Sequence, residues 1–131
     1  MKVLDPGHAY RLNQFDTINS LFEIIDPVEL VFVKREGEGY PGNVGHYPGT
    51  NLQEVCRVCI NRLKYLDNQI SNPVNIPAIN HFRSIIRLLE IRAAERHGRP
   101  WVEPMVPIEL VPTCPTCGHI GCIGNHKIHE T

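Results

Sequence analysis

The residues best suited to chemistry gather near the carboxyl-terminal end, where three cysteines and three histidines lie within 16 residues. Cys114 and Cys117 form a Cys-x2-Cys pair on a turn rich in proline and glycine, which is typical of half a zinc knuckle. Cys122 and either His126 or His129 would complete a tetrahedral site, because Zn²⁺ prefers thiolate and imidazole donors. Four protein ligands leave no open position, so the sequence predicts a structural zinc ion.

Three further residues offer alternatives to this ligand set. His119 would be a ligand only if Cys122 were not. Cys56 and Cys59 repeat the Cys-x2-Cys spacing, but they lie on the apolar stripe of a predicted helix, which favours two thiols in the core. The alternative is a metal site that they share with the carboxyl-terminal cysteines. For the tail as a whole, the alternative is a segment without fixed structure that carries reactive cysteines.

A second candidate site consists of arginines at helical spacing. Arg92 and Arg96 lie four residues apart on one helical face, where like charges repel by roughly 0.2–0.5 kcal/mol unless an anion binds between them. The guanidinium group matches the geometry of phosphate oxygens. The structural alternative is that the cations stabilise the helix end and that Glu95 pairs with Arg92 or Arg99. Arg62 is a further candidate on the preceding helix.

Charge is unevenly distributed in a chain of otherwise ordinary globular composition. Residues 51–99 carry eight Lys and Arg against four Asp and Glu, whereas both flanks are net acidic. This asymmetry favours an anionic ligand at the middle segment. It disfavours nucleic acid, because a nucleic-acid-binding domain is usually basic throughout. Two of the middle arginines, Arg83 and Arg87, are expected to be solvated.

The apolar pattern excludes several classes of protein. Apolar residues are 42% and charged residues 21% of the 131 residues, which is typical of one folded domain rather than a disordered chain. No apolar run approaches the roughly 20 residues needed to cross a bilayer, so no membrane partner is expected. The first residues lack an apolar signal segment. We therefore expect a cytoplasmic protein whose cysteines stay reduced.

Two helices must position the arginines. The first is predicted over residues 51–71, with a capping box at Thr50 and Gln53 or, in a rival register, at Asn51 and Glu54. Its apolar seam recurs at helical spacing. The members of this seam are Leu52, Cys56, Cys59, Leu63, Leu66 and Ile70.

The second helix follows after a tight connection. Asn75 is the predicted N-cap, and Gly98 is the predicted residue just after the helix end. Its seam consists of Ile79, Phe82, Ile86, Leu89 and Ala93. The short connection forces the two helices to run antiparallel. Since two helices alone bury little apolar surface, we expect a homodimer or a higher homo-oligomer.

The segments that flank the hairpin complete an α+β chain. The run Leu30–Val33 predicts a buried strand within residues 29–35, and a helical spacing precedes it over residues 18–25. Residues 36–50 contain five glycines and two prolines, which predicts a loop without regular elements. A short strand is possible at residues 3–4. The predicted parts are a β and loop region (1–50), the helical hairpin (51–99), a proline-rich strap (100–113) and a zinc knuckle (114–131).

Five segments carry a resemblance to a known family. They read FVKREG from residue 32, YPGNVGH from residue 40, GTNLQEVCR from residue 49, NRLKYLDNQ from residue 61 and EIRAAERHGR from residue 90. Together they resemble the helical-hairpin sponge proteins that phages use against cyclic-nucleotide immune signalling, including the Thoeris anti-defence and anti-CBASS sponges. The resemblance covers about residues 29–99. The first residues and the Cys/His tail have no counterpart in that family.

The resemblance implies a ligand and a set of site residues. Sponges of this kind sequester a cyclic ADP-ribose isomer or cyclic oligonucleotides without cleaving them, and they work as dimers or larger oligomers. The positions that would face the nucleotide are Arg62, Asn75, Arg92, Arg96 and Arg99. The aromatic residues that could stack on a base are Tyr40, Tyr47 and Phe82, of which Phe82 fits the core better.

These observations favour binding over catalysis. No Ser–His–Asp, Cys–His or His-Glu-x-x-His arrangement occurs in a plausible context. We therefore predict a non-enzymatic phage protein that sequesters a cyclic nucleotide immune signal in the cytoplasm of an infected bacterial host. The alternative is a zinc-stabilised module that binds a host protein or nucleic acid.

Overall fold

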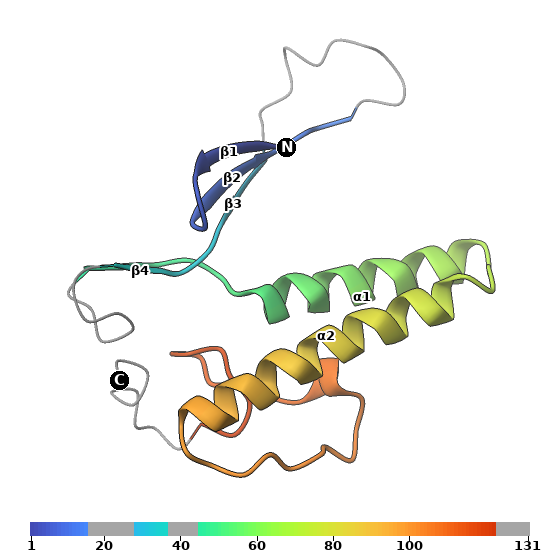
Figure 1. The fold of residues 1–131 in the computed structure, drawn as a ribbon. Coiled ribbons are helices and arrows are strands. Elements are labelled where there is room, and N and C mark those ends of the chain that lie inside the picture. Colours follow the sequence, from blue (N-terminus) through green and yellow to red (C-terminus); the bar gives the residue numbers. More distant parts are fainter. Residues whose placement is uncertain (16–27, 37–44, 123–131) are drawn as a thin grey trace.

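The protein is an α+β chain in which a small sheet leads into a long helical hairpin and a cysteine-bearing turn (Figure 1). A computed structural model describes residues 1–15, 28–36 and 45–122. The elements in chain order are β1 (Lys2–Asp5), β2 (Ala9–Leu12), β3 (Val28–Val31), β4 (Lys34–Glu36), β5 (Gly45–Tyr47), α1 (Leu52–Gln69), α2 (Asn75–Arg96) and the short 3-10 helix η2 (Ile108–Leu110). Within the described residues, no helix is long and apolar enough to cross a membrane.

The first sheet is antiparallel with the order β1-β2-β3. Val3 pairs with Tyr10, which in turn pairs with Leu30, so the short strand expected at residues 3–4 is confirmed. The prediction of one continuous strand over residues 29–35 is wrong. β3 ends at Val31, and Phe32 then makes an isolated bridge to Thr50.

The chain crosses the start of the hairpin at this bridge. The N–H of Thr50 donates to the carbonyl of Val31 at 2.8 Å, and the N–H of Val33 donates to the carbonyl of Thr50 at 2.9 Å. A Cβ on Gly49 would overlap the backbone of Phe32. Glycine is therefore required here for two backbone segments to approach closely.

The second sheet corrects another prediction, because it forms inside the segment expected to lack regular elements. β4 pairs with β5 in the antiparallel register Lys34–Tyr47. The hydrogen bonds between β4 and β5 stabilise strands that the residue preferences of a glycine-rich segment do not predict. The helix expected over residues 18–25 and the candidate Tyr40 lie outside the described residues.

α1 begins in the rival capping register. The side-chain oxygen of Asn51 accepts a hydrogen bond from the N–H of Glu54 at 2.8 Å, whereas Gln53 is buried rather than part of a cap. The face in the core matches the predicted seam only in part. Cys56 is buried and Leu63 packs against the core as predicted, whereas Leu52 and Ile70 are exposed and Ile60, outside that seam, is completely buried. Contacts with α2 and the strap select the buried face, and sequence spacing alone allows more than one.

α2 begins without a side-chain cap, so the prediction of Asn75 as N-cap is wrong. Val74 is the cap residue, and the side chain of Asn75 donates instead to Asp67 Oδ1 at 2.9 Å. The predicted helix end is confirmed, because Gly98 has φ +64° and the N–H of Arg99 donates a hydrogen bond to the carbonyl of Ala94.

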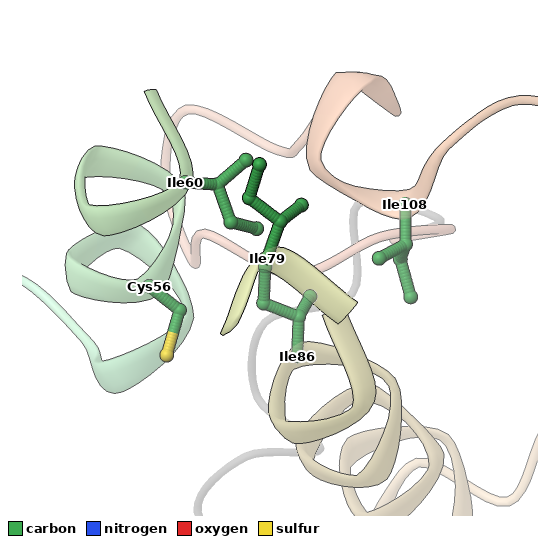
Figure 2. Close-up of a cluster of buried hydrophobic side chains, with 5 residues drawn as sticks. All are labelled: Cys56, Ile60, Ile79, Ile86 and Ile108. Carbon is green, nitrogen blue, oxygen red and sulfur yellow. The ribbon is translucent and has the colours of Figure 1, made fainter. Parts of the chain in front are cut away.

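The core lies between the two antiparallel helices and the strap (Figure 2). Its buried members are Cys56, Ile60, Ile79, Ile86 and Ile108. Leu63, Phe82, Trp101 and Ile120 are partly buried against this cluster. Ile108 belongs to η2, so the strap contributes to the core of the hairpin as well as covering one side of it.

Ion pairs hold the strap on α2. Arg83 donates two hydrogen bonds of 2.8 Å to the carboxylate of Glu109, and Lys64 forms an ion pair with the same carboxylate at 3.1 Å. Arg87 pairs with Glu103 at 2.8 Å. The prediction that Arg83 and Arg87 are solvated is wrong for Arg83, which is half-buried against Glu109 of the strap, whereas Arg87 stays exposed beside Glu103.

Candidate functional site: a cysteine cluster beside an arginine-lined cleft

Three cysteines gather on the turn that follows the strap. The Sγ atoms of Cys114, Cys117 and Cys122 lie within 4.8 Å of one another. The N–H of Gly118 donates to the carbonyl of Cys114 at 2.8 Å, and the N–H of Cys114 donates to the carbonyl of His119 at 3.0 Å. Among the described residues, this is the one group of three or more His, Cys, Asp or Glu side chains placed to hold a metal ion.

The cysteine cluster has the donor chemistry of a zinc site. Hydrogen bonds from the backbone N–H groups of Cys117 and Thr116 lower the pKa of the Cys114 thiol to about 7. Burial, foremost among several causes, raises the pKa of the Cys117 thiol to about 12. A bound divalent cation would stabilise all three thiolates, since thiols deprotonate when they coordinate zinc. The cluster can therefore hold a metal ion, with one position left for a fourth ligand.

The structure shows which of the alternative metal ligands lie in the cysteine cluster. Cys122 lies in the cluster, whereas His119 Nδ1 lies 3.4 Å from the Gln53 amide and 3.7 Å from Glu90 Oε2. Cys56 lies in the core, where burial raises the pKa of its thiol, and Cys59 is half-buried on the same helix. Neither of these two cysteines joins the cluster. The remaining candidates, His126 and His129, lie outside the described residues.

A buried carboxylate ties the cysteine turn to the hairpin. Glu90 is completely buried, and its Oε2 accepts a hydrogen bond from the N–H of Ile120 at 3.1 Å. Its Oε1 accepts from the Gln53 amide at 3.4 Å and lies 3.9 Å from Arg57. Arg99 donates to the carbonyl of Ile120 at 2.7 Å. The N–H and the carbonyl of Ile120, which belong to two successive peptide units, are thus held by the side chains of Glu90 and Arg99.

Sequence analysis missed Glu90, although a signal was present. Glu90 lies four residues after Ile86 and three before Ala93, so it continues the apolar seam of α2. A carboxylate at a seam position must find partners inside the fold, because an unpaired buried charge is costly. Those partners come from α1 and the cysteine turn.

A cleft of about 790 Å³ opens beside the cysteine cluster. Tyr10 of β2 and Phe32 of the bridge after β3 line it on one side, and α2 lines it with Leu89, Arg92 and Arg96. The other walls are the first turn of α1 (residues 51–54) and residues 113–119 of the cysteine turn, which runs from Thr113 to Cys122. The two arginines are exposed at the cleft, so the pair singled out from its spacing lies beside the cysteine cluster.

The other residues implied by the resemblance lie elsewhere. Arg62 lies nine residues beyond Gln53 on α1, about 14 Å along the helix axis, with its guanidinium 5.3 Å from the ring centre of Tyr65. Asn75 lies at the turn of the hairpin. Tyr47 lies in β5, its ring 5.8 Å from that of His8. Arg99, as described above, holds the cysteine turn.

Two aromatic residues of the cleft were not candidates from the sequence. Tyr10 and Phe32 line the cleft with their ring centres 5.9 Å apart in an edge-to-face arrangement. They come from β2 and from the bridge after β3, so no local spacing relates them to the arginines. Pairing within the sheet and the crossing at Thr50 bring them to the start of α1.

Comparison with known proteins gives no independent assignment of this site. No family model, no curated protein and no solved structure matches the chain. The chemistry of the cleft and of the cysteine cluster is therefore the basis for a functional proposal.

Proposed function

We propose that this protein is a non-catalytic phage sponge that binds and sequesters a cyclic nucleotide immune signal, either a cyclic ADP-ribose isomer or a cyclic oligonucleotide. The observation that carries the proposal is one cleft lined by two arginines, a helix start and an aromatic pair. The resemblance of the hairpin sequence to phage sponges supports the choice of ligand. The proposed setting is the cytoplasm of an infected bacterium, with the protein acting as a homo-oligomer.

The arginine side of the cleft suits phosphate groups. Arg92 and Arg96 lie one helical turn apart and both line the cleft, so their guanidinium groups can bind the same phosphate or two adjacent ones. The first turn of α1 opens into the same cleft, and the positive end of a helix favours anions. The carboxylate of Glu54, also in the cleft wall, is paired with Arg57 at 3.2 Å, which limits its repulsion of an anion.

The opposite side of the cleft suits a base. Tyr10 and Phe32 offer aromatic surface, and Leu89 adds an aliphatic contact. Aromatic side chains stack on nucleobases with little dependence on base identity. The volume of about 790 Å³ lies within the range of about 300–1,000 Å³ usual for small-molecule sites. A ligand with phosphates at one end and a purine at the other would use both sides.

We assign the cysteine cluster a structural zinc ion with His126 or His129 as the proposed fourth ligand. A zinc ion with four protein ligands has no open position for a substrate. The metal would then shape the cleft and take no part in turnover, which agrees with sequestration.

Calorimetry tests the proposed function directly. Zinc-loaded protein is titrated with a panel of cyclic dinucleotides, cyclic trinucleotides and cyclic ADP-ribose isomers, and the ligand released by heating is identified by chromatography. We expect tight binding to one panel member and its recovery intact. Recovery of a cleaved product would overturn the sponge assignment, and so would the absence of heat from every panel member.

Arginine variants localise the binding. The double variant Arg92→Met, Arg96→Met keeps the aliphatic stems but removes both charges. If each arginine contributes about 1.5 kcal/mol through a charge-assisted hydrogen bond, the affinity falls by about two orders of magnitude. The matched control is Arg62→Met, which removes one exposed arginine outside the cleft and should leave the affinity unchanged.

A second candidate function, a zinc-stabilised module that binds a protein, is favoured by the strap. Its exposed apolar side chains are Val102, Met105, Val106 and Leu110, and a partner protein would cover them. Replacing Met105 and Val106 by serine should abolish partner binding in that case. The same change should leave cyclic nucleotide binding intact if the protein is a sponge.

A further inference from the structure

The turn that carries the cysteine cluster is also a wall of the cleft. Thr113 and the residues from Cys114 to His119 line the cleft together with Arg92 and Arg96 of α2. The same seven residues include two members of the cysteine cluster. Any process that orders or releases this turn therefore changes the shape of the cleft beside the two arginines.

Side chains of the hairpin bind backbone groups of the turn at both helices. The carboxylate of Glu90 accepts a hydrogen bond from the N–H of Ile120, and the guanidinium group of Arg99 donates to the carbonyl of Ile120. At the other helix, the side-chain amide of Asn51 donates to the carbonyl of Gly118 at 3.4 Å while its oxygen caps α1. These contacts involve peptide groups of the turn, so they depend on its backbone conformation rather than on its side chains.

Besides the cysteines, that conformation is held by these hydrogen bonds and by the side chains of His119 and Ile120. Gly118 and Gly121 adopt positive φ values of +75° and +71°, and Ile120 is the turn residue that packs against the core. Ordering each residue costs about 1–2 kcal/mol of conformational entropy. Several hydrogen bonds that each contribute about 1 kcal/mol offset only part of this cost. Metal coordination by the three thiolates would supply the remainder.

We propose that a divalent metal ion bound by Cys114, Cys117 and Cys122 builds this wall of the cleft, so that the metal and an anionic ligand raise each other's affinity. Glu90 and Arg99 act as positioning residues that connect the metal-ordered turn to α2. The ligand half of the proposal rests on the proposed function, whereas the metal-built wall does not. Reciprocity follows from linkage, because two ligands that favour one conformation must favour each other's binding equally.

Two measurements on the full-length protein test the proposal. Hydrogen exchange followed by mass spectrometry compares metal-free protein, kept reduced, with protein that holds Zn²⁺. We expect one zinc ion per chain and slower exchange in peptides covering residues 50–57 and 88–99. Calorimetry with cyclic di-adenosine monophosphate as the probe should show an affinity at least about tenfold higher in the zinc-loaded protein.

Matched variants identify the path of the coupling. Cys117→Ser should abolish zinc binding and zinc-dependent protection, whereas Cys59→Ser removes a thiol outside the cluster and should change neither. Arg99→Met should keep the zinc ion but lose most of the protection at the end of α2. Arg62→Met is its matched control and should behave as the unmodified protein.

The possible outcomes are distinct. Failure to bind zinc would overturn the proposal, and so would zinc binding that leaves exchange at both helix ends unchanged. Equal probe affinity with and without zinc would overturn the coupling while the sponge assignment stands. Zinc-dependent protection without any heat from the whole nucleotide panel would support the metal-built wall and overturn the proposed ligand.

Discussion

The ion-pair cluster between the strap and the hairpin can be tested through Glu109. Its carboxylate is 5% exposed and is held by Arg83 and Lys64. Hydrogen bonds from Arg83, the largest cause, and from Lys64 lower the pKa of Glu109 from 4.5 to about 2, against an opposing effect of burial. We therefore expect Glu109→Gln to loosen the strap and to lower the free energy of unfolding at neutral pH.

The size of this effect follows from the pKa. A carboxyl pKa that falls from 4.5 to about 2 corresponds to at most about 3.4 kcal/mol of stability at neutral pH. Lys64 and Arg83 are 42% and 33% exposed, so solvent screens both pairs. We expect a loss of about 2 kcal/mol after this screening is included.

The pH dependence gives the sign of the effect. Because the folded-state pKa lies below the unfolded value, the stabilisation is complete above pH 4.5 and disappears as the pH falls from 4.5 towards 2. Urea unfolding of the natural protein and of Glu109→Gln, measured between pH 7 and pH 2.5, should therefore give free energies that converge at low pH.

A control variant and a contrary result complete the test. Glu103→Gln removes the partner of Arg87, but this carboxylate is 57% exposed, so a much smaller effect is expected. If the difference in free energy between the natural protein and Glu109→Gln were the same at pH 7 and pH 2.5, the ionic account of the strap would be wrong.

Three further predictions concern the elements that support the cleft. Ile60→Ala should cost about 2–5 kcal/mol because it leaves a cavity in the core, whereas Leu52→Ala, at a 54% exposed position, should cost far less; thermal unfolding compares the two. Asn51→Ala removes the cap of α1 and should cost about 1 kcal/mol, while Asn51→Asp, which keeps an acceptor for the N–H of Glu54, should retain most of that stability in urea. Gly49→Ala should disrupt the crossing of the first sheet over the hairpin, since its Cβ would overlap backbone; circular dichroism and exchange at residues 30–33 would report native spectra if this reasoning failed.

Local chemistry explains the features that sequence analysis predicted correctly. The two helices and their antiparallel connection follow from apolar spacing and from turn residues, which act over a few positions. Gly98 ends α2 because a residue without Cβ adopts positive φ at low cost. The Cys-x2-Cys spacing likewise brings two thiols together within one turn, and Cys122 is near enough along the chain to join them.

Choices among equivalent local patterns required the tertiary structure. Asn51 and Thr50 were both plausible caps. Val31 and Val33 bind the N–H and the carbonyl of Thr50, and Asn51 caps the helix. Apolar spacing leaves open which face of α1 is buried. The face that carries Ile60 is selected because it joins one core cluster with residues of α2 and with Ile108 of the strap. Spacing describes one helix at a time, whereas the buried face depends on what packs against it.

Some groups of the candidate site are brought together by local sequence, and others only by the tertiary fold. The pairing of Arg92 with Arg96 and the thiol pair of the cysteine turn were determined by sequence, because helices and turns relate residues over one or two turns of chain. The meeting of those groups with Tyr10, Phe32 and Glu90 was decided by the fold. Sheet pairing and the crossing at Thr50 act between segments far apart in sequence, which no periodicity along the chain records. The periodicity of α2 marks the position of Glu90 as buried, but it does not identify the partners of that carboxylate.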